Sequence, residues 1–260
     1  NMNISLRFAA SSRYLESAPE LIIKYKGRDP YLIDFARDQV PDVQRLVVDI
    51  GDAAIEDSLD IFAAAAKHHK NIAFMCLLSQ NTTLLAEEHL KFFFSEPATT
   101  ITKLNELLSH YPSDVTIAGE LGFSLQTIAP YLKNKGISVR VIVNGEDAEA
   151  EPAHKFFIRP EALPLYEDLV DTFVLDGPLQ IQDTLYSIYQ EGTWAGGLEM
   201  LIPTLGAEIR NDTIMPIFDS LRMDCRKKCG YGKCNTCDNV FAIAKSLEDK
   251  GVIMKVKENK

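Results

Sequence analysis

The sequence has no apolar run near the length of about 18 to 20 residues that a helix needs to cross a bilayer. It also lacks the basic and apolar stretches of an N-terminal signal peptide, and Asn1 before Met2 is typical of a cloning remnant. Positive charge is in short supply, because 27 Lys and Arg stand against 37 Asp and Glu, a net charge of −10. We therefore predict a cytoplasmic protein whose main partner is neither a membrane nor double-stranded DNA.

Motifs of several common enzyme families are absent. No G-x-S-x-G, H-E-x-x-H, Walker A or G-x-G-x-x-G sequence occurs, so nothing supports a serine hydrolase, a zincin or a nucleotide-binding fold. With 46% hydrophobic and 25% charged residues, the composition excludes collagen-like, coiled-coil and disordered classes. A length of 260 residues fits two small domains or one large α/β barrel.

The chain does contain a repeated alternation of β-rich runs and helical segments. Several runs, such as 46–50 and 72–78, are apolar throughout, as expected for strands buried on both faces of a parallel sheet. The predicted strands are 4–9, 21–26, 45–50, 72–78, 114–118, 138–144, 155–159 and 172–175. The predicted helices between them are 58–69, 84–94, 101–110, 125–135 and 161–170, and Gly136 is a glycine stop.

This order predicts an α/β fold, a (β/α)8-type barrel that is either complete or incomplete and distorted, with an open doubly wound sheet as the alternative. If the interval between the first two strands is too short for a helix, they form a hairpin. After residue 175 the pattern changes to helices at 181–189, 198–205, 214–223 and 240–247, with a short strand at 252–256. We therefore predict a barrel over 1–177 and a helical extension over 178–260 that packs on it.

Four of the five cysteines form the array Cys225-x3-Cys229-x4-Cys234-x2-Cys237. In a reducing compartment, such a cluster indicates a metal or iron–sulfur site more than a disulfide framework. Thiolates are soft ligands that suit zinc or iron–sulfur clusters, and the x4 and x2 spacings match a plant-type ferredoxin segment. The array predicts a [4Fe–4S] cluster, with zinc as the main alternative and uncoordinated or paired thiols as the remaining one.

Basic residues flank these cysteines at Arg226, Lys227, Lys228 and Lys233. Their charges favour thiolates and offset the negative charge of four sulfurs. The fifth cysteine, Cys76, lies among apolar residues in a predicted strand. We expect it to be a small buried hydrophobic residue.

Polar residues follow several predicted strands, where parallel α/β folds place their working groups. We predict Glu120 and Asp176 as the acid and base of a reaction and Arg159 as the clamp of an anionic substrate. The same residue types also cap helices and close loops, which is the competing interpretation for each. The other residues in such positions are Asp49, Asp52, Ser79, Gln80 and Asn144.

The sequence VTIAGEL at 115–121, Ser124-Leu125 after it, and SVRVIVNG at 138–145 resemble the core of the collagenase-like peptidase family. Members of that family are α/β barrels in which a strand ends in Glu-Leu-Ser, a helix follows, and the next strand ends in His-Gly-Ala before a cysteine. Some relatives hold a four-cysteine iron–sulfur cluster and take part in the hydroxylation of RNA bases or ubiquinone precursors. The resemblance thus implies a barrel with cluster-dependent chemistry.

The chain also departs from the family pattern. Gly122-Phe123 is inserted before Ser124, Asn144 stands where the family has its histidine, and Arg140 stands where it has an acidic residue. The sequence EDA at 146–148 replaces Ala-x-Cys, and the cysteines gather near the C-terminus where the relatives spread theirs out. We therefore expect that the chain is not an active peptidase.

Two hypotheses of function follow. In the first, the barrel is an iron–sulfur-dependent modifying enzyme that performs hydroxylation-type or related redox chemistry on a small or nucleobase-like substrate. In the second, the cysteine loop is a zinc staple, and the barrel is a non-catalytic scaffold that binds a protein or RNA partner through the basic loop residues.

Overall fold

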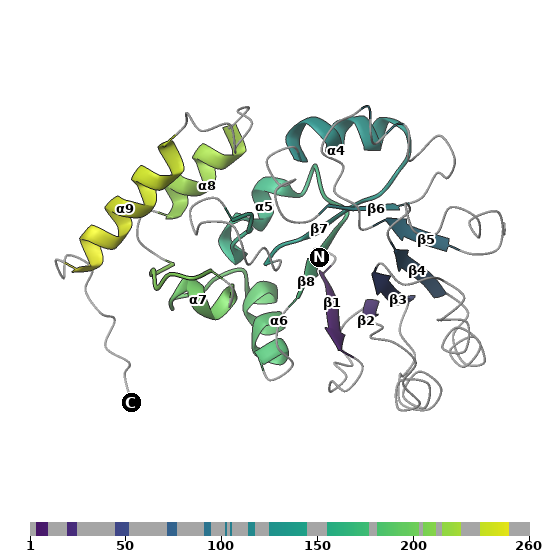
Figure 1. Ribbon diagram of the computed structural model, residues 1–260, viewed down its shortest axis with the longest axis horizontal. Coiled ribbons are helices and arrows are strands. Elements are labelled where there is room, and N and C mark those ends of the chain that lie inside the picture. Colours follow the sequence, from purple (N-terminus) through teal and green to yellow (C-terminus); the bar gives the residue numbers. More distant parts are fainter. Residues whose placement is uncertain are drawn as a thin grey trace.

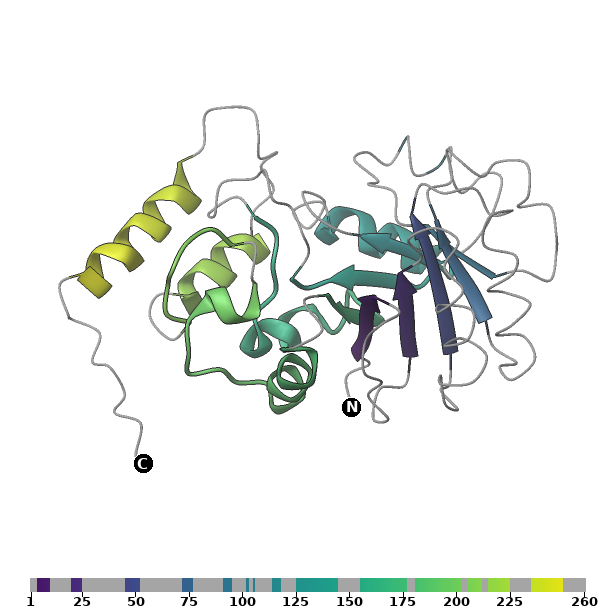
Figure 2. The same cartoon turned by 60° about the horizontal axis from the view of Figure 1, so that its bottom comes forward.

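Figure 1 shows the computed structural model of the chain. It describes residues 4–9, 20–24, 45–51, 72–76, 91–94, 102, 105, 114–117, 125–144, 155–176, 181–202, 205–211, 215–224 and 235–249. In two views, α8 (Met215–Asp224) and α9 (Thr236–Asp249) lie at the opposite end of the molecule from strands β3 to β5 (Figures 1 and 2).

The strands pair in chain order, each parallel to the next, and β8 pairs with β1, so that the order closes on itself. Because β1 and β2 are parallel, the hairpin alternative is excluded. The (β/α)8-type barrel and its boundary at residue 177 stay predictions, because most of the chain between β1 and β6 lies outside the described residues. The strands are β1 (Ile4–Ala9), β2 (Glu20–Lys24), β3 (Arg45–Gly51), β4 (Ile72–Cys76), β5 (Lys91–Phe94), β6 (Asp114–Ile117), β7 (Val139–Ile142) and β8 (Thr172–Leu175).

Two predicted elements are wrong. The predicted helix over 84–94 ends in a strand, because Lys91–Phe94 is β5 and pairs with β4 and β6. Three consecutive phenylalanines suit a pleated strand better than a helical face. The predicted strand over 155–159 is instead a segment outside any strand, which makes one backbone hydrogen bond, from Ile158 N to Val143 O at 2.8 Å, just past the end of β7. The reason is that β6 and β8 already occupy both edges of β7.

The helix α4 (Leu125–Asn134) covers β7 with one apolar face (Figure 1). Its buried residues Leu125, Ile128, Ala129 and Leu132 follow the i, i+3, i+4, i+7 spacing of a helix that packs on a sheet. All four residues of β7 are buried, as expected for a strand between two others.

The predicted helix over 161–170 is shorter than expected. The chain forms the 3-10 turn η6 (Pro160–Ala162) and the helix α5 (Leu163–Tyr166), and then a turn. Proline at the start of each element favours initiation, but it cannot donate the backbone hydrogen bond of a helix interior. The result is a tight corner directly after Arg159.

The C-terminal half contains α6 (Gln182–Glu191), the short α7 (Leu198–Leu201), α8 and α9. An aromatic row joins the last two helices to the extended segment. Phe218 of α8 stacks on Phe157 with ring centroids 5.8 Å apart, and Phe241 of α9 meets Phe218 edge-on at 5.1 Å. These buried rings supply the apolar part of the contact between α8, α9 and the 155–159 segment.

Helix α4 ends at a glycine in the left-handed region, which confirms the glycine stop predicted there. Gly136 has φ +72°, and a Cβ built at this position meets nothing within 4 Å. We expect Gly136→Ala to lower the free energy of unfolding by about 1 to 2 kcal/mol, because only the backbone conformation opposes the added methyl group. Urea denaturation measures this change. Gly136→Asn is the control and should cost less; equal stability of the alanine variant and the wild type would contradict the assignment.

Candidate functional site

Charged and amide side chains of the described chain gather where the 155–159 segment meets α8. Residues 155–160 are all buried. Arg159 has extended backbone geometry, with φ −74° and ψ 157°, and Pro160 follows it as the start of η6. The segment therefore delivers the Arg159 side chain into the interior, toward α8.

The Arg159 guanidinium donates hydrogen bonds to two residues. Its Nε and Nη2 donate to Oδ2 of Asp219 at 2.9 and 2.6 Å. Its Nη1 donates to the main-chain oxygen and Oδ1 of Asn211 at 2.7 and 2.8 Å, and lies 3.3 Å from Oε2 of Glu161. The exposed fraction of the Arg159 side chain is 3%, and that of Asp219 is 9%. This is a buried ion pair with its hydrogen bonds satisfied by protein groups.

Asn211 and Glu161 connect this pair to a third segment. Nδ2 of Asn211 donates to Oε1 of Glu161 at 2.8 Å and to the main-chain oxygen of Trp194 at 2.7 Å. The Trp194 amide donates to the same Glu161 oxygen at 2.7 Å. The cluster thus ties together η6, the turn at 194–197, residue 211 and α8.

The electrostatics of the cluster are those of a desolvated site. Burial raises the pKa of Asp219, while the hydrogen bonds and charge of Arg159 and the charge of Arg222 act in the opposite direction. Burial also raises the pKa of Tyr189, whose hydroxyl donates to the main-chain oxygen of Ile158 at 2.8 Å. Because Arg159 is bound by protein acceptors and almost fully buried, this geometry weighs against the predicted role of substrate clamp. That role stays a prediction.

A second cation, Arg222, lies one helical turn after Asp219 on α8. Its guanidinium carbon lies 4.5 Å from the ring centroid of Phe157 and 4.2 Å from that of Phe218. Its Nη2 donates to the main-chain oxygen of Lys155. Burial lowers the pKa of Arg222 to about 10. Electrostatic interaction with Cys237 and, more weakly, a hydrogen bond with it oppose this lowering of the pKa. Cys237 is the one predicted ligand that lies within the described residues, and its side chain is half-buried.

The other predicted ligands, Cys225, Cys229 and Cys234, lie outside the described residues. Within the described ranges, no group of three or more His, Cys, Asp or Glu side chains is arranged to hold a metal ion. In the sequence, the array lies between two described helices. Cys225 directly follows the last residue of α8, and Cys237 is the second residue of α9. The cysteine array therefore joins the two helices that pack through Phe218 and Phe241.

The predicted acid and base are only partly placed. Glu120 lies outside the described residues. Asp176 directly follows β8 and is 2% exposed, and its amide donates to Oδ1 of Asn144 at 2.8 Å. Nδ2 of Asn144 donates to the main-chain oxygens of Asp176 and, at 3.2 Å, of Leu201. The structure thus brings Asn144 and Asp176 together, and none of the contacts of Arg159 described above is with Asp176.

Comparisons with protein-family models, with curated proteins and with solved structures found no match. The resemblance to the collagenase-like peptidase family therefore rests on the sequence motifs alone. None of the described helices is both long and apolar enough to cross a membrane.

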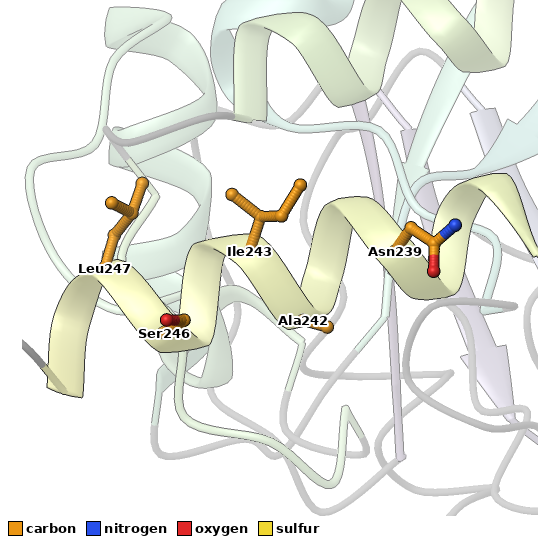
Figure 3. Close-up of a pocket in the computed structure, with 5 residues that line it drawn as sticks. All are labelled: Asn239, Ala242, Ile243, Ser246 and Leu247. Atoms are coloured by element: carbon orange, nitrogen blue, oxygen red, sulfur yellow. The ribbon is translucent and has the colours of Figure 1, made fainter.

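A hollow of about 600 Å³ lies along α9, away from the ion-pair cluster. Its described lining comes from α9 alone: Asn239, Ala242, Ile243, Ser246 and Leu247 (Figure 3). These side chains are small, amide or aliphatic and contain no titratable group. They offer no acid, base or metal ligand, so the hollow is not the candidate site.

Four residues of the cluster were not predicted as site residues from the sequence: Glu161, Asn211, Asp219 and Arg222. A signal for two of them exists in α8. Asp219 and Arg222 share a buried face with Phe218, and charged residues on the apolar face of a helix are almost always paired when buried. Asn211 carries no comparable signal, because it lies outside any helix or strand.

The ion-pair cluster predicts a large effect on stability. We expect Asp219→Ala to lower the free energy of unfolding by about 3 to 5 kcal/mol. The variant keeps the Arg159 guanidinium buried but removes the carboxylate that accepts its hydrogen bonds. Chemical denaturation measures this loss. The matched control is Lys133→Ala, which removes a surface ion pair with Asp171, 3.8 Å long and with side chains 34% and 44% exposed. That change should cost less than about 1 kcal/mol, and equal costs for the two variants would contradict the buried pair.

Proposed function

We propose that the chain is an iron–sulfur-dependent modifying enzyme that acts on a small or nucleobase-like substrate and is not an active peptidase. The observation that carries the proposal is the array Cys225-x3-Cys229-x4-Cys234-x2-Cys237, whose last cysteine lies in the first turn of α9. The basic residues Arg226, Lys227, Lys228 and Lys233 within the array offset the negative charge of the thiolates that metal coordination requires.

The donor set fits an iron–sulfur cluster. Cys225, Cys229, Cys234 and Cys237 would hold it, between two helices fixed to each other by aromatic packing. When bound, such a cluster supplies one-electron transfer. The hydroxylation-type or related redox chemistry is taken from the family resemblance.

The remaining roles belong to the residues that follow the strands. Glu120 and Asp176 are proposed to hold and move protons of the substrate. For Arg159 we propose a positioning role in place of the substrate clamp, since its hydrogen bonds hold α8 and residue 211. By holding α8, Arg159 also positions the helix from which the cysteine array departs.

Metal analysis tests the proposal. The chain purified without oxygen should contain about four iron and four sulfide per molecule and should be brown. Cys237→Ser should lose most of the iron, because a ligand is removed. Cys76→Ala is the control and should keep it, because Cys76 lies in β4. Wild-type protein with neither iron nor zinc, and with all four array thiols open to titration, would contradict any metal centre.

One observation favours the second candidate, a non-catalytic zinc-stapled barrel that binds a protein or RNA. Arg159, which the enzyme hypothesis assigned to binding an anionic substrate, donates its hydrogen bonds to Asp219 and Asn211 inside the protein. Under this alternative, the basic residues Arg226, Lys227, Lys228 and Lys233 of the cysteine loop are the working surface.

RNA binding distinguishes this alternative. A colourless protein with one zinc ion, whose RNA affinity falls steeply with salt, would support it. Replacing Arg226, Lys227 and Lys228 together by glutamine should then abolish binding, whereas Lys133→Gln on α4 should not. An iron-containing wild type that binds no RNA, measured by fluorescence anisotropy, would exclude it.

A further inference from the structure

We infer that the hollow along α9 is the docking site of the chain's own residues 252–256, which fold back as a strand onto the helix that precedes them. Their sequence is VIMKV, and they lie outside the described residues. The hollow that receives them is lined by described residues of α9. The inference goes beyond the proposed function, because it requires neither a metal centre nor a substrate.

The first support is a sequence pattern that occurs twice in the chain. Residues 128–136, in α4 and directly after it, read Ile-Ala-x2-Leu-x2-Lys-Gly, and residues 243–251, in α9 and directly after it, read the same. In both copies a valine stands five positions after the glycine, as Val141 and as Val256. The helix α9 with residues 252–256 is therefore similar in sequence to α4 with the first part of β7.

The second support is the way in which the first copy folds. Gly136, with φ +72°, follows the end of α4, and its amide donates to the main-chain oxygen of Lys133 at 2.9 Å. The amide of Ile137 donates to the main-chain oxygen of Leu132 at 3.0 Å. These two hydrogen bonds form a Schellman motif. The chain that leaves this motif becomes β7 and packs on the helix it has just left (Figure 1).

The second copy has the residues that the same turn needs. The helix α9 ends two residues before Gly251, as α4 ends two residues before Gly136. Val252 then takes the place of Ile137. In a Schellman motif this residue commonly contacts the third residue from the end of the helix, which in α9 is Leu247. Leu247 lines the hollow, so the turn directs the chain across it.

The hollow offers an apolar face of matching length. Its lining residues follow i, i+3, i+4, i+7, i+8 spacing, which places them on one side of α9 (Figure 3). Ile243 on this side is 53% exposed, whereas Phe241, which packs on α8, is 7% exposed. The helix rises about 12 Å from Asn239 to Leu247. Residues 252 to 256 span about 13 Å when extended.

The alternation of side chains in the segment fits this face. In an extended strand the apolar residues 252, 254 and 256 lie on one side, and residues 253 and 255 lie on the other. Valine, isoleucine and methionine at four of the five positions favour burial of the strand, and the β-branched residues favour the extended form. Met254 is the central residue of the apolar side. We therefore expect it against Ile243, the most central large residue of the hollow.

The first test is a nuclear Overhauser spectrum of the full chain labelled with ¹³C at the methyl groups of Met, Ile, Leu and Val. We expect cross peaks between Met254 and Ile243 and between Val252 and Leu247, because docked side chains are in contact. A wild type in which Met254 has no cross peak to α9 contradicts the inference. Cross peaks that arise only between differently labelled molecules contradict it as well, because a second copy then fills the hollow.

The second test is the rate at which dilute peroxide oxidises Met254, read by mass spectrometry. We expect oxidation about tenfold slower than in an unstructured peptide of the same sequence, since an undocked minor state of about 10% carries the reaction. Ile243→Asp should restore the rate of the peptide, because a carboxylate in the apolar face opposes docking. The control Ile217→Asp changes a residue of α8 that is 60% exposed, and should keep the slow rate.

Alternation supplies a second control within the segment. Ile253→Asp lies on the side of the strand that faces away from α9, so Met254 should stay protected in this variant. Equal oxidation rates in the wild type and the free peptide would overturn the inference. An equal gain in rate from Ile243→Asp and Ile217→Asp would overturn it too, because the protection would then not come from the hollow. The cross peaks of the wild type decide the case in which Ile243→Asp does not fold.

Discussion

The attachment of the C-terminal helices to the strand-bearing part depends on the buried ion pair between Arg159 and Asp219. Moving a guanidinium and a carboxylate out of water costs several kcal/mol for each ion, and this cost is offset only when every hydrogen-bonding partner is in place. Here the hydrogen-bonding partners of Arg159 come from Asp219 of α8 and from Asn211, and the Glu161 carboxylate lies 3.3 Å away as a second negative charge. Because a misplaced α8 would leave both charges buried and unpaired, the cluster permits one docked arrangement and opposes the others.

The same constraint extends along α8 to Arg222. Asp219 and Arg222 are three residues apart on that helix, so the hydrogen bonds that hold Asp219 also set the rotation that brings Arg222 between Phe157 and Phe218. Apolar packing of aromatic rings alone specifies rotation weakly, whereas hydrogen bonds from a planar guanidinium specify direction. The position of Arg222 between the two rings therefore follows from the ion pair one helical turn earlier.

Local patterns predicted much of the fold, and the misses have physical causes. The 4–9 and 172–175 strands and the stop at Gly136 were predicted correctly, because apolar runs and a glycine after a lysine are local signals. The 155–159 segment has the same apolar character as a strand, but pairing is decided by whether a sheet edge is free, which is not local information. Likewise, nothing near Arg159 in the sequence reveals Asp219, sixty residues later, as its partner.

The position of Asn144 bears on the peptidase resemblance. A carboxamide carries a donor and an acceptor side by side, and Asn144 uses them on the main-chain oxygen and amide of one residue, Asp176. The imidazole that the family has at this position carries its two nitrogens on opposite sides of the ring and cannot bond both groups of one residue in the same way. The Asn144 amide donates to the main-chain oxygens of Asp176 and of Leu201 in α7, so this side chain links the ends of β7 and β8 to a helix. In this chain Asn144 therefore has a structural role at the ends of β7 and β8.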